Sequence, residues 1–487
     1  MDARLKNLDY AFNPGSIAFV GASESLNKWG FLILNNILTG GYEGRVYPVN
    51  PGRETVLGLP AYPSIRDIPG DIHLAIFSVP PQQVFGALED CLTRGVKAGV
   101  VVTAGFKEVG EDGAELEVEL LRKCREAGMV LIGPNCQGVS CPPNKLYSWM
   151  PILFHPPAGK ISFVSQSGNV LNMLIEQVVA CGFGASKAVS SGNEADLKTE
   201  DYISYLCEDP DSDVIVSYME GVRDGRILLE RASAVSRKKP IVMLKGGRTR
   251  SGISAAKSHT GAMAVSERLF EAAARQAGII MVGSIEEAGI IASSFINRPL
   301  PQGRRVGIIT GGGGLGVLAA DFCTEEGLEV PSLSPSTLSE LAHLMPDWWV
   351  PGNPVDLVAG LDFNIIKPTI ELLMKSGEVD SIMFLWIGSR KKEEAVDTSR
   401  GGRDISGLWD MLEKRFYDYA RELYQLMQEL QVPLYISTSL DINQVAVDED
   451  SGNRQPMIYP SVEAACRAIS AMASYGGYRR AHDGEKV

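Results

Sequence analysis

Short runs of apolar, mostly β-branched residues recur along the chain, each followed by a turn of small residues and then by apolar residues at helical spacing. The first run, Ile17–Val20, ends in the turn Gly21–Ser23 and precedes a helical pattern over Ile33–Leu38. Strand, turn and helix repeating in this order are typical of parallel α/β sheets. We therefore predict an α/β fold, with ligands at the carboxyl ends of the strands. Further strands of the first set are expected at Leu74–Val79, Val100–Thr103 and Val130–Gly133.

The same unit starts two more sets of strands. Ile161–Val164 turns through Ser165–Gly168 into a helical pattern, and Val306–Ile309 turns through a run of glycines. Because single cores stop growing beyond roughly 250 to 300 residues, we expect about three domains. The segment Pro142–Pro157 lacks either period and is interpreted as a linker. The polar stretch Ser389–Lys414 is rich in both charges and is interpreted as a surface excursion or mobile loop. The remaining predicted strands are Val214–Met219, Ile241–Leu244, Ile382–Ile387 and Pro433–Ser437.

Charge and hydropathy limit the environment and the partners. The chain has 487 residues and a net charge of -13, which disfavours nucleic acid as a partner. Its longest apolar runs are far shorter than a bilayer span, and residues 1–12 lack the apolar core of a secretory signal. Eight scattered cysteines without a Cys-x-x-Cys pair suit a reducing compartment. We expect a cytoplasmic protein with no membrane or nucleic-acid partner.

Among the five histidines, His259 has the context of a nucleophile. It lies in Ser258–Gly261, between a predicted strand and a small-residue helical run that begins at Ala262. Neutral imidazole is a good nucleophile near pH 7, and a helix N-terminus favours an anionic phospho-imidazole. The same residue also fits a solvated loop. The sequence therefore offers His259 as a candidate carrier of phosphate and leaves the simpler interpretation open.

Two other turns strengthen that candidate. Glu220 follows the strand Val214–Met219, where its carboxylate can accept a proton from one imidazole nitrogen and make the other the attacking atom. The turn Ser165–Gly168 opens a helix, which suits a phosphoryl group, although a simple N-cap is an equal alternative. No set of residues has the spacing of a metal site.

The run Gly311–Gly316 contains Gly-x-Gly-x-x-Gly after a strand, with Glu329 further on. This pattern keeps a nicotinamide-dependent dehydrogenase open as an alternative. It is a weak signal, because a lone glycine pattern has many false positives and this one lies in the third set of strands.

The motifs taken together resemble those of the acyl-CoA synthetases that form ADP or GDP, relatives of succinyl-CoA synthetase. The resemblance runs nearly end to end. It rests on the following segments: Val20–Ser23, Tyr47–Pro51, Ala104–Glu108, Ile132–Cys136, Ser165–Gly168, Ser191–Asp196, Ser258–Ala262, Gly311–Gly316 and Asn353–Leu357. It demotes the dehydrogenase interpretation.

The resemblance implies a Rossmann-like CoA-binding domain followed by two flavodoxin-like, succinyl-CoA synthetase-like domains with parallel sheets. Their expected bounds are 1–145, 158–298 and 302–480, with the phosphohistidine in the second. The implied enzyme is an acid-thiol ligase: phosphate attacks an acyl-CoA to give acyl phosphate and CoA, His259 takes the phosphoryl group, and ADP or GDP receives it.

The resemblance also assigns roles to single residues. His259 carries the covalent phosphate and Glu220 pairs with it. The phosphate ligands implied are Ser165, Gln166, Ser167, Gly168, Asn193 and Gly261. The coenzyme A ligands implied are Gly21, Ala22, Ser23, Lys28, Asn50, Val79, Pro80 and Asn135.

One departure from the family concerns the nucleotide. No ATP-grasp module follows in the sequence, so the resemblance implies a partner β subunit that carries ADP/ATP or GDP/GTP with Mg, in an assembly such as a heterotetramer. Two smaller departures are Gln137, where leucine is commoner, and Asn169, where a small residue usually follows Ser-Gly. Asn169 adjoins the phosphate turn and is expected to alter substrate choice. A non-catalytic CoA- or acyl-CoA-binding regulatory protein remains an alternative, which retention of His259 and Glu220 argues against.

Overall fold

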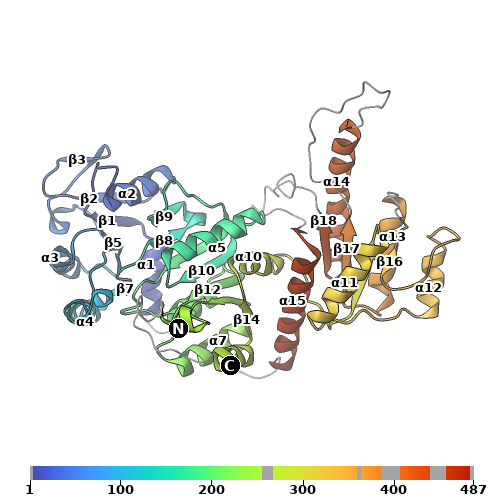
Figure 1. Ribbon diagram of the computed structural model, residues 1–487. Coiled ribbons are helices and arrows are strands. Elements are labelled where there is room, and N and C mark those ends of the chain that lie inside the picture. The colour runs from blue at the N-terminus through green and yellow to red at the C-terminus, as the bar shows by residue number, and fades with distance from the viewer. Residues whose placement is uncertain (1–3, 255–266, 359–362, 387–405, 439–456, 483–487) are drawn as a thin grey trace. The chain divides into compact units, whose positions relative to one another are not determined.

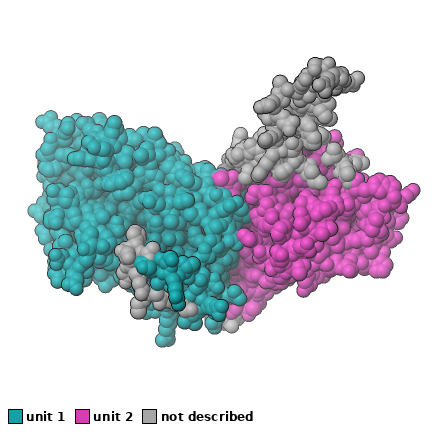
Figure 2. Space-filling model, viewed as in Figure 1, with its two compact units in different colours: residues 1–179, 183–292, 487 teal, residues 180–182, 293–486 magenta. Residues whose placement is uncertain are grey.

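The computed structural model describes residues 4–254, 267–358, 363–386, 406–438 and 457–482 (Figure 1). The chain divides into two compact units (Figure 2). Unit 1 comprises residues 1–179 and 183–292, and unit 2 comprises residues 180–182 and 293–486. Among the helices of the described residues, none is both long and apolar enough to cross a membrane.

The first sheet of unit 1 is parallel, with strand order β2-β1-β5-β6-β7. The order changes direction between β1 and β5, and such a switch point is where open α/β sheets bind ligands. Strands β1, β5, β6 and β7 are continuous buried runs because helices cover both faces, whereas the edge strand β2 is exposed at its start. The elements are α1 Asp9–Phe12, β1 Ser16–Val20, α2 Trp29–Thr39, β2 Arg45–Val49, β3 Thr55–Val56, β4 Leu59–Pro60, β5 Leu74–Phe77, α3 Pro81–Thr93, β6 Ala98–Val101, α4 Glu111–Glu126 and β7 Val130–Ile132, with short 3-10 helices at Leu5–Leu8, Ile65–Asp67, Lys107–Val109 and Pro142–Asn144.

The second sheet of unit 1 has the order β14-β13-β12-β10-β11-β8-β9. Its switch point lies between β10 and β12, and β8 and β9 add an antiparallel edge. One hydrophobic core runs through both sheets, which makes them one compact unit. The elements are β8 Gly138–Cys141, β9 Leu146–Trp149, β10 Ala158–Ser165, α5 Gly168–Ala180, β11 Ala185–Ser190, α6 Thr199–Glu208, β12 Val214–Met219, α7 Gly225–Ser236, β13 Ile241–Lys245, α9 Glu267–Gln276, β14 Ile279–Val282 and α10 Ile285–Ser294.

The interpretation of Pro142–Pro157 as a linker is wrong. Strand β9 lies within it and is buried along its whole length, and Trp149 is fully buried. The prolines of the segment lie outside the strand, where they remove no ladder hydrogen bond. Trp149 stacks on Phe154, with ring centroids 5.6 Å apart, so the stretch packs as part of the second sheet.

Unit 2 contains a parallel sheet of order β16-β15-β17-β18-β19 with its own core. Of the predicted excursion or mobile loop Ser389–Lys414, residues 389–405 lie outside the described residues, whereas residues 406–414 belong to helix α14, so they do not form a loop. The elements are β15 Val306–Thr310, α11 Gly313–Glu325, α12 Pro335–Ala342, β16 Val355–Asp356, α13 Phe363–Ser376, β17 Ser381–Trp386, α14 Ser406–Leu430, β18 Leu434–Thr438, β19 Ile458–Tyr459 and α15 Val462–His482.

The parallel α/β prediction is confirmed, and each predicted strand is present with its ends shifted by a few residues at most. The bounds of three domains remain a prediction, since the first two sheets share one compact unit.

Candidate active site

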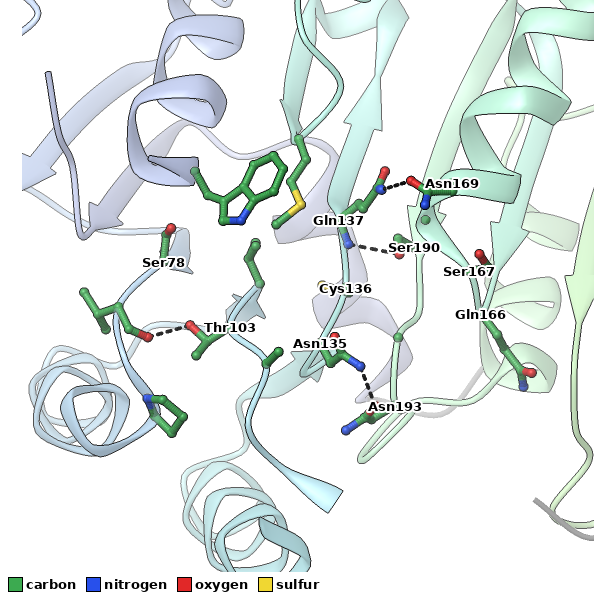
Figure 3. A pocket seen from close by; sticks show the side chains of 18 of the residues that line it. Ser78, Thr103, Asn135, Cys136, Gln137, Gln166, Ser167, Asn169, Ser190 and Asn193 are labelled. Atoms are coloured by element: carbon green, nitrogen blue, oxygen red, sulfur yellow. Dashed lines mark hydrogen bonds between the residues drawn. The ribbon is translucent and has the colours of Figure 1, made fainter. Parts of the chain in front are cut away.

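A cavity of about 590 Å³ lies in unit 1, where strand ends of the first sheet face the first turn of α5 (Figure 3). Of the described residues that line it, none carries a charged side chain. The lining residues are Trp29, Ser78, Val79, Pro80, Pro81, Val102, Thr103, Ala104, Asn135, Cys136, Gln137, Met150, Gln166, Ser167, Gly168, Asn169, Ser190, Gly192 and Asn193.

One wall of the cavity is formed by the turns that follow β5 and β6. Thr103 Oγ1 donates a hydrogen bond to the carbonyl of Val79 at 2.7 Å, which ties the two turns together (Figure 3). Pro80 precedes α3, and Pro81 occupies its first position, where a missing N–H costs nothing. The predicted coenzyme A residues Val79 and Pro80 therefore line the cavity.

The turn Gly21–Ser23 follows β1 at the switch point of the first sheet. Gly21 has φ +91°, and a Cβ there would lie 2.4 Å from the carbonyl oxygen of Ser78. The amide of Asn50 donates to the carbonyl of Ala22 at 2.8 Å and holds the turn. Gly21, Ala22, Ser23, Lys28 and Asn50 do not line the cavity themselves, but Trp29, next to the exposed Lys28, does.

Asn135 and Asn193 meet at one end of the cavity. Asn135 Nδ2 donates to Asn193 Oδ1 at 3.3 Å, and the Asn135 N–H donates to the carbonyl of Thr103 at 2.9 Å (Figure 3). The amide of Asn193 donates in turn to Glu108 at 2.6 Å and to Glu117 at 2.9 Å. Because both amide hydrogens of Asn193 are used, its contacts favour a positioning role over direct contact with phosphate.

The turn Ser165–Gly168 joins β10 to α5 at the switch point of the second sheet. Ser165 Oγ donates to the carbonyl of Ser167 at 2.6 Å and accepts from the N–H of Ser167 at 3.2 Å, which closes the turn. In the first turn of α5, the N–H groups of Gly168 and Asn169 have no partner within the helix, whereas the Val170 N–H donates to Ser167 Oγ at 3.5 Å. The helix dipole adds positive potential there. Such an end suits a phosphate without any cationic side chain.

The side chain of Gln166 links this turn to two other segments. Its Oε1 accepts from the N–H groups of Glu220 at 2.7 Å and Gly221 at 3.1 Å. Its Nε2 donates to Glu194 Oε2 at 3.1 Å and to the carbonyl of Gly221 at 3.0 Å. Gln166 therefore holds the Glu220 turn against the serine turn. Its own N–H donates to the carbonyl of Tyr218 at 3.2 Å, so its contacts favour a positioning role over direct contact with phosphate.

Glu194 is a buried carboxyl that the sequence assigned no role. Ser191 and Thr199 donate to its Oε1 at 2.9 and 2.8 Å. Burial raises the pKa of Glu194 above its ordinary value, while the hydrogen bonds from Thr199, Ser191 and Gln166 oppose that shift.

Glu220 is half-buried after β12 and does not line the cavity. Tyr218 donates its hydroxyl to Glu220 Oε1 at 3.4 Å, and burial together with that carboxylate raises the pKa of Tyr218 to about 12. Lys245 Nζ donates to the carbonyl of Glu220 at 2.7 Å, and burial lowers the pKa of Lys245. The predicted nucleophile His259 and the predicted phosphate ligand Gly261 lie outside the described residues.

Several lining residues gave no clear sequence signal. Trp29 lies just ahead of an apolar helical run, Met150 in the segment that was interpreted as a linker, and Ser190 in a strand that was not predicted. Only folding brings them to one cavity. Gln137 and Asn169 did give a signal, since both depart from the family pattern.

Comparison with known families agrees with these observations. A model described as "CoA binding domain" matches residues 15–142, one described as "Succinyl-CoA ligase like flavodoxin domain" matches 158–295, and one described as "Ligase-CoA domain" matches 306–388. The acetate–CoA ligase (ADP-forming) II subunit alpha of Pyrococcus furiosus is 36% identical over 88% of this chain and 94% of its own length. The chain belongs to the ADP-forming acyl-CoA ligase family.

Other relatives in this family differ in length. Subunit alpha of acetate–CoA ligase (ADP-forming) I from Pyrococcus furiosus is 34% identical over 98% of this chain and 99% of its own. The acetate–CoA ligase (ADP-forming) of Methanocaldococcus jannaschii is 38% identical over 73% of this chain. The matched part covers 49% of that longer relative.

A solved structure in the family has the same fold. It is the "dinucleotide forming acetyl-coenzyme A synthetase 1" of Ca. Korarchaeum cryptofilum in complex with phosphate and ADP. It is 32% identical, with a TM-score of 0.83 over 99% of both chains. Membership in the ligase family leaves no support for the dehydrogenase interpretation of Gly311–Gly316.

Proposed function

We propose that this chain is the CoA-binding subunit of an acyl-CoA ligase that converts acyl-CoA, phosphate and a nucleoside diphosphate into a carboxylate, CoA and a nucleoside triphosphate. The observation that carries the proposal is the shared cavity: Val79 and Pro80 of the CoA-binding domain and Ser167 and Gly168 of the phosphate turn line the same space. A thioester and a phosphate bound to these two walls would meet there.

In the first step, a phosphate oxygen attacks the thioester carbonyl carbon. The carbon–sulfur bond breaks, the CoA thiolate leaves and takes up a proton, and acyl phosphate remains. The N–H groups at the start of α5 hold the phosphate and its developing charge in a cavity whose described lining is neutral. Coenzyme A is held by the turns after β1, β5 and β6, with Asn135 at the end nearest the second sheet.

In the second step, an imidazole nitrogen of His259 attacks the phosphorus of the acyl phosphate. The bond from phosphorus to the acyl oxygen breaks, the carboxylate leaves, and the phosphoryl group stays on His259 until a nucleoside diphosphate takes it. Glu220 accepts the proton of the other ring nitrogen. The link from Gln166 to the backbone of Glu220 supports this role, because it ties the carboxylate's turn to the phosphate turn.

The nucleotide and Mg belong to a partner in this proposal. The chain matches family members named subunit alpha over nearly their full length, which supports an ATP-grasp β subunit and a hetero-oligomer such as a heterotetramer. Eight free cysteines, seven of them buried, support the cytoplasm as the compartment.

The proposal is tested by thiol release. The chain, with and without a nucleotide-binding subunit from the same organism, is mixed with a panel of acyl-CoAs, and free CoA is measured with phosphate or with sulfate. We expect one class of acyl-CoA to release thiol only when phosphate is present. If CoA binds but phosphate never promotes release, even with the partner, the chain is a CoA-binding regulatory protein.

A further inference from the structure

Gln137 and Asn169, the two departures from the family pattern, are in direct contact. Gln137 Nε2 donates a hydrogen bond to Asn169 Oδ1 at 2.9 Å (Figure 3), and Asn172 Nδ2 donates to Gln137 Oε1 at 3.0 Å. Both Gln137 and Asn169 line the cavity, whereas Asn172 does not. The two unusual residues therefore form one amide cluster on the cavity wall.

The backbone fixes where this cluster stands. The Gln137 N–H donates to Ser190 Oγ at 3.0 Å, and its carbonyl accepts from the N–H of Met150 at 2.9 Å. Its side chain lies against the phosphate turn, since a Cβ on Gly168 would be 2.1 Å from Gln137 Cγ. Asn169 is the residue directly after Gly168. An acyl phosphate held at this turn would place its acyl group within reach of both amides.

The hydrogen-bonding capacity of the cluster selects the chemistry of that acyl group. One amide hydrogen of Gln137 is used, and within the described part of the chain neither amide hydrogen of Asn169 has an acceptor. These groups can donate to an oxygen on the substrate. Because the described lining holds no Lys, Arg or His, a second carboxylate would be desolvated without a counter-charge, which is costly. A neutral oxygen, such as a hydroxyl or carbonyl, has no such cost.

We infer that Gln137 and Asn169 form the acyl-selective wall of the site, and that the substrate is a monocarboxylate whose acyl group carries an uncharged hydrogen-bonding oxygen a few bonds from the carboxyl carbon. This inference rests on the proposed function. A purely aliphatic acyl group would leave the donors unpaired, and a site built to hydrogen-bond discriminates against an analogue that lacks the partner.

The test is a titration of the chain with pairs of ligands that differ by one hydroxyl: 3-hydroxybutyryl-CoA and 4-hydroxybutyryl-CoA against butyryl-CoA, with succinyl-CoA and CoA as references. We expect one hydroxyacyl-CoA to bind about tenfold more tightly than butyryl-CoA. In Asn169→Ala and in Gln137→Leu that preference should fall to near unity, while the affinity for CoA stays within about twofold.

Two variants are used because Gln137→Leu leaves the Asn172 amide without its acceptor, whereas Asn169 is exposed on the first turn of α5 and can be shortened without opening a core. The inference is overturned if the wild type prefers butyryl-CoA or succinyl-CoA, or if both variants retain the preference for the hydroxyacyl-CoA. In either case, binding of CoA leaves the proposed function standing. Failure of every ligand, CoA included, overturns both.

Discussion

The side-chain amide of Gln166 lies 3.1 Å from the carboxylate of Glu194 and donates a hydrogen bond to it. The oxygen of the same amide accepts from the backbone of Glu220, so one side chain connects the turns that follow β10, β11 and β12. These three turns lie at the switch point of the second sheet, where the phosphate chemistry is proposed. The geometry of Glu220 therefore depends on Gln166.

Replacing Gln166 by leucine removes this connection without a large change of volume. Two backbone N–H groups lose their partner and the Glu194 carboxylate loses one of its three donors, and each unsatisfied buried group costs about 1–3 kcal/mol. We expect the free energy of unfolding to fall by about 2 kcal/mol or more, and phosphate-dependent thiol release to fall with it. Urea unfolding and the thiol assay measure the two effects.

Gln276→Leu is the matched control for that variant. Gln276 is exposed at the end of α9, so its replacement should change neither quantity appreciably. If Gln166→Leu and Gln276→Leu have the same free energy of unfolding and the same thiol release, the hydrogen bonds of Gln166 contribute to neither.

Glu194 should make stability depend on pH in a definite direction. Its pKa is raised in the folded state, so above the ordinary value of 4.5 the folded chain binds more protons than the unfolded chain. The free energy of unfolding contributed by this group therefore falls as pH rises through that window. Glu194→Gln has no proton to lose there.

We expect the free energy of unfolding of Glu194→Gln, measured relative to the wild type by urea unfolding, to be higher at about pH 8 than at about pH 5. Subtracting the two proteins at each pH removes the contributions of the other titrating groups. A difference that stays constant between the two pH values, or that grows in the opposite direction, contradicts the raised pKa.

Gly21 cannot accept a side chain. Alanine at φ +91°, with its Cβ 2.4 Å from the Ser78 carbonyl, must displace the turn after β1 or the turn after β5. We expect Gly21→Ala to lower the free energy of unfolding by about 1–3 kcal/mol and to weaken coenzyme A binding at least about tenfold, which calorimetry would measure.

Gly86→Ala is its counterpart in helix α3, where a Cβ meets nothing within 4 Å. That variant should gain about 0.5–1 kcal/mol, because alanine has the higher helix propensity, and should bind coenzyme A normally. If Gly21→Ala binds coenzyme A as well as Gly86→Ala does, the turn after β1 is not part of the coenzyme site.

The elements predicted correctly from the sequence are those whose buried residues are mostly apolar. Strand β12 was predicted with its observed ends, Val214–Met219, because a run that is largely buried on both faces is mostly apolar. Strand β11, Ala185–Ser190, was missed because it contains Lys187 among small residues. That lysine is buried and pairs with Asp209 at 2.7 Å, a long-range contact that no local pattern indicates.

The candidate site was predicted in its parts rather than in its connections. Strand–turn–helix patterns placed Ser165–Gly168 and Glu220 at strand ends, as the structure does. The Gln166 connection joins residues 54 positions apart, and no periodicity reports such a contact. Asn193 was predicted as a phosphate ligand, but the two carboxylates that occupy its amide come from residues 85 and 76 positions away.

Locating the phosphoryl group tests directly whether His259 carries it. The wild-type chain and the variants His259→Ala and Glu220→Gln are incubated with radiolabelled phosphate and the acyl-CoA selected by the thiol assay, with and without the nucleotide-binding subunit, and the labelled residue is identified by peptide mapping. We expect acid-labile, base-stable label on His259 in the wild type, much less in Glu220→Gln, and none in His259→Ala. Label on another residue, or label that persists in His259→Ala, would contradict it.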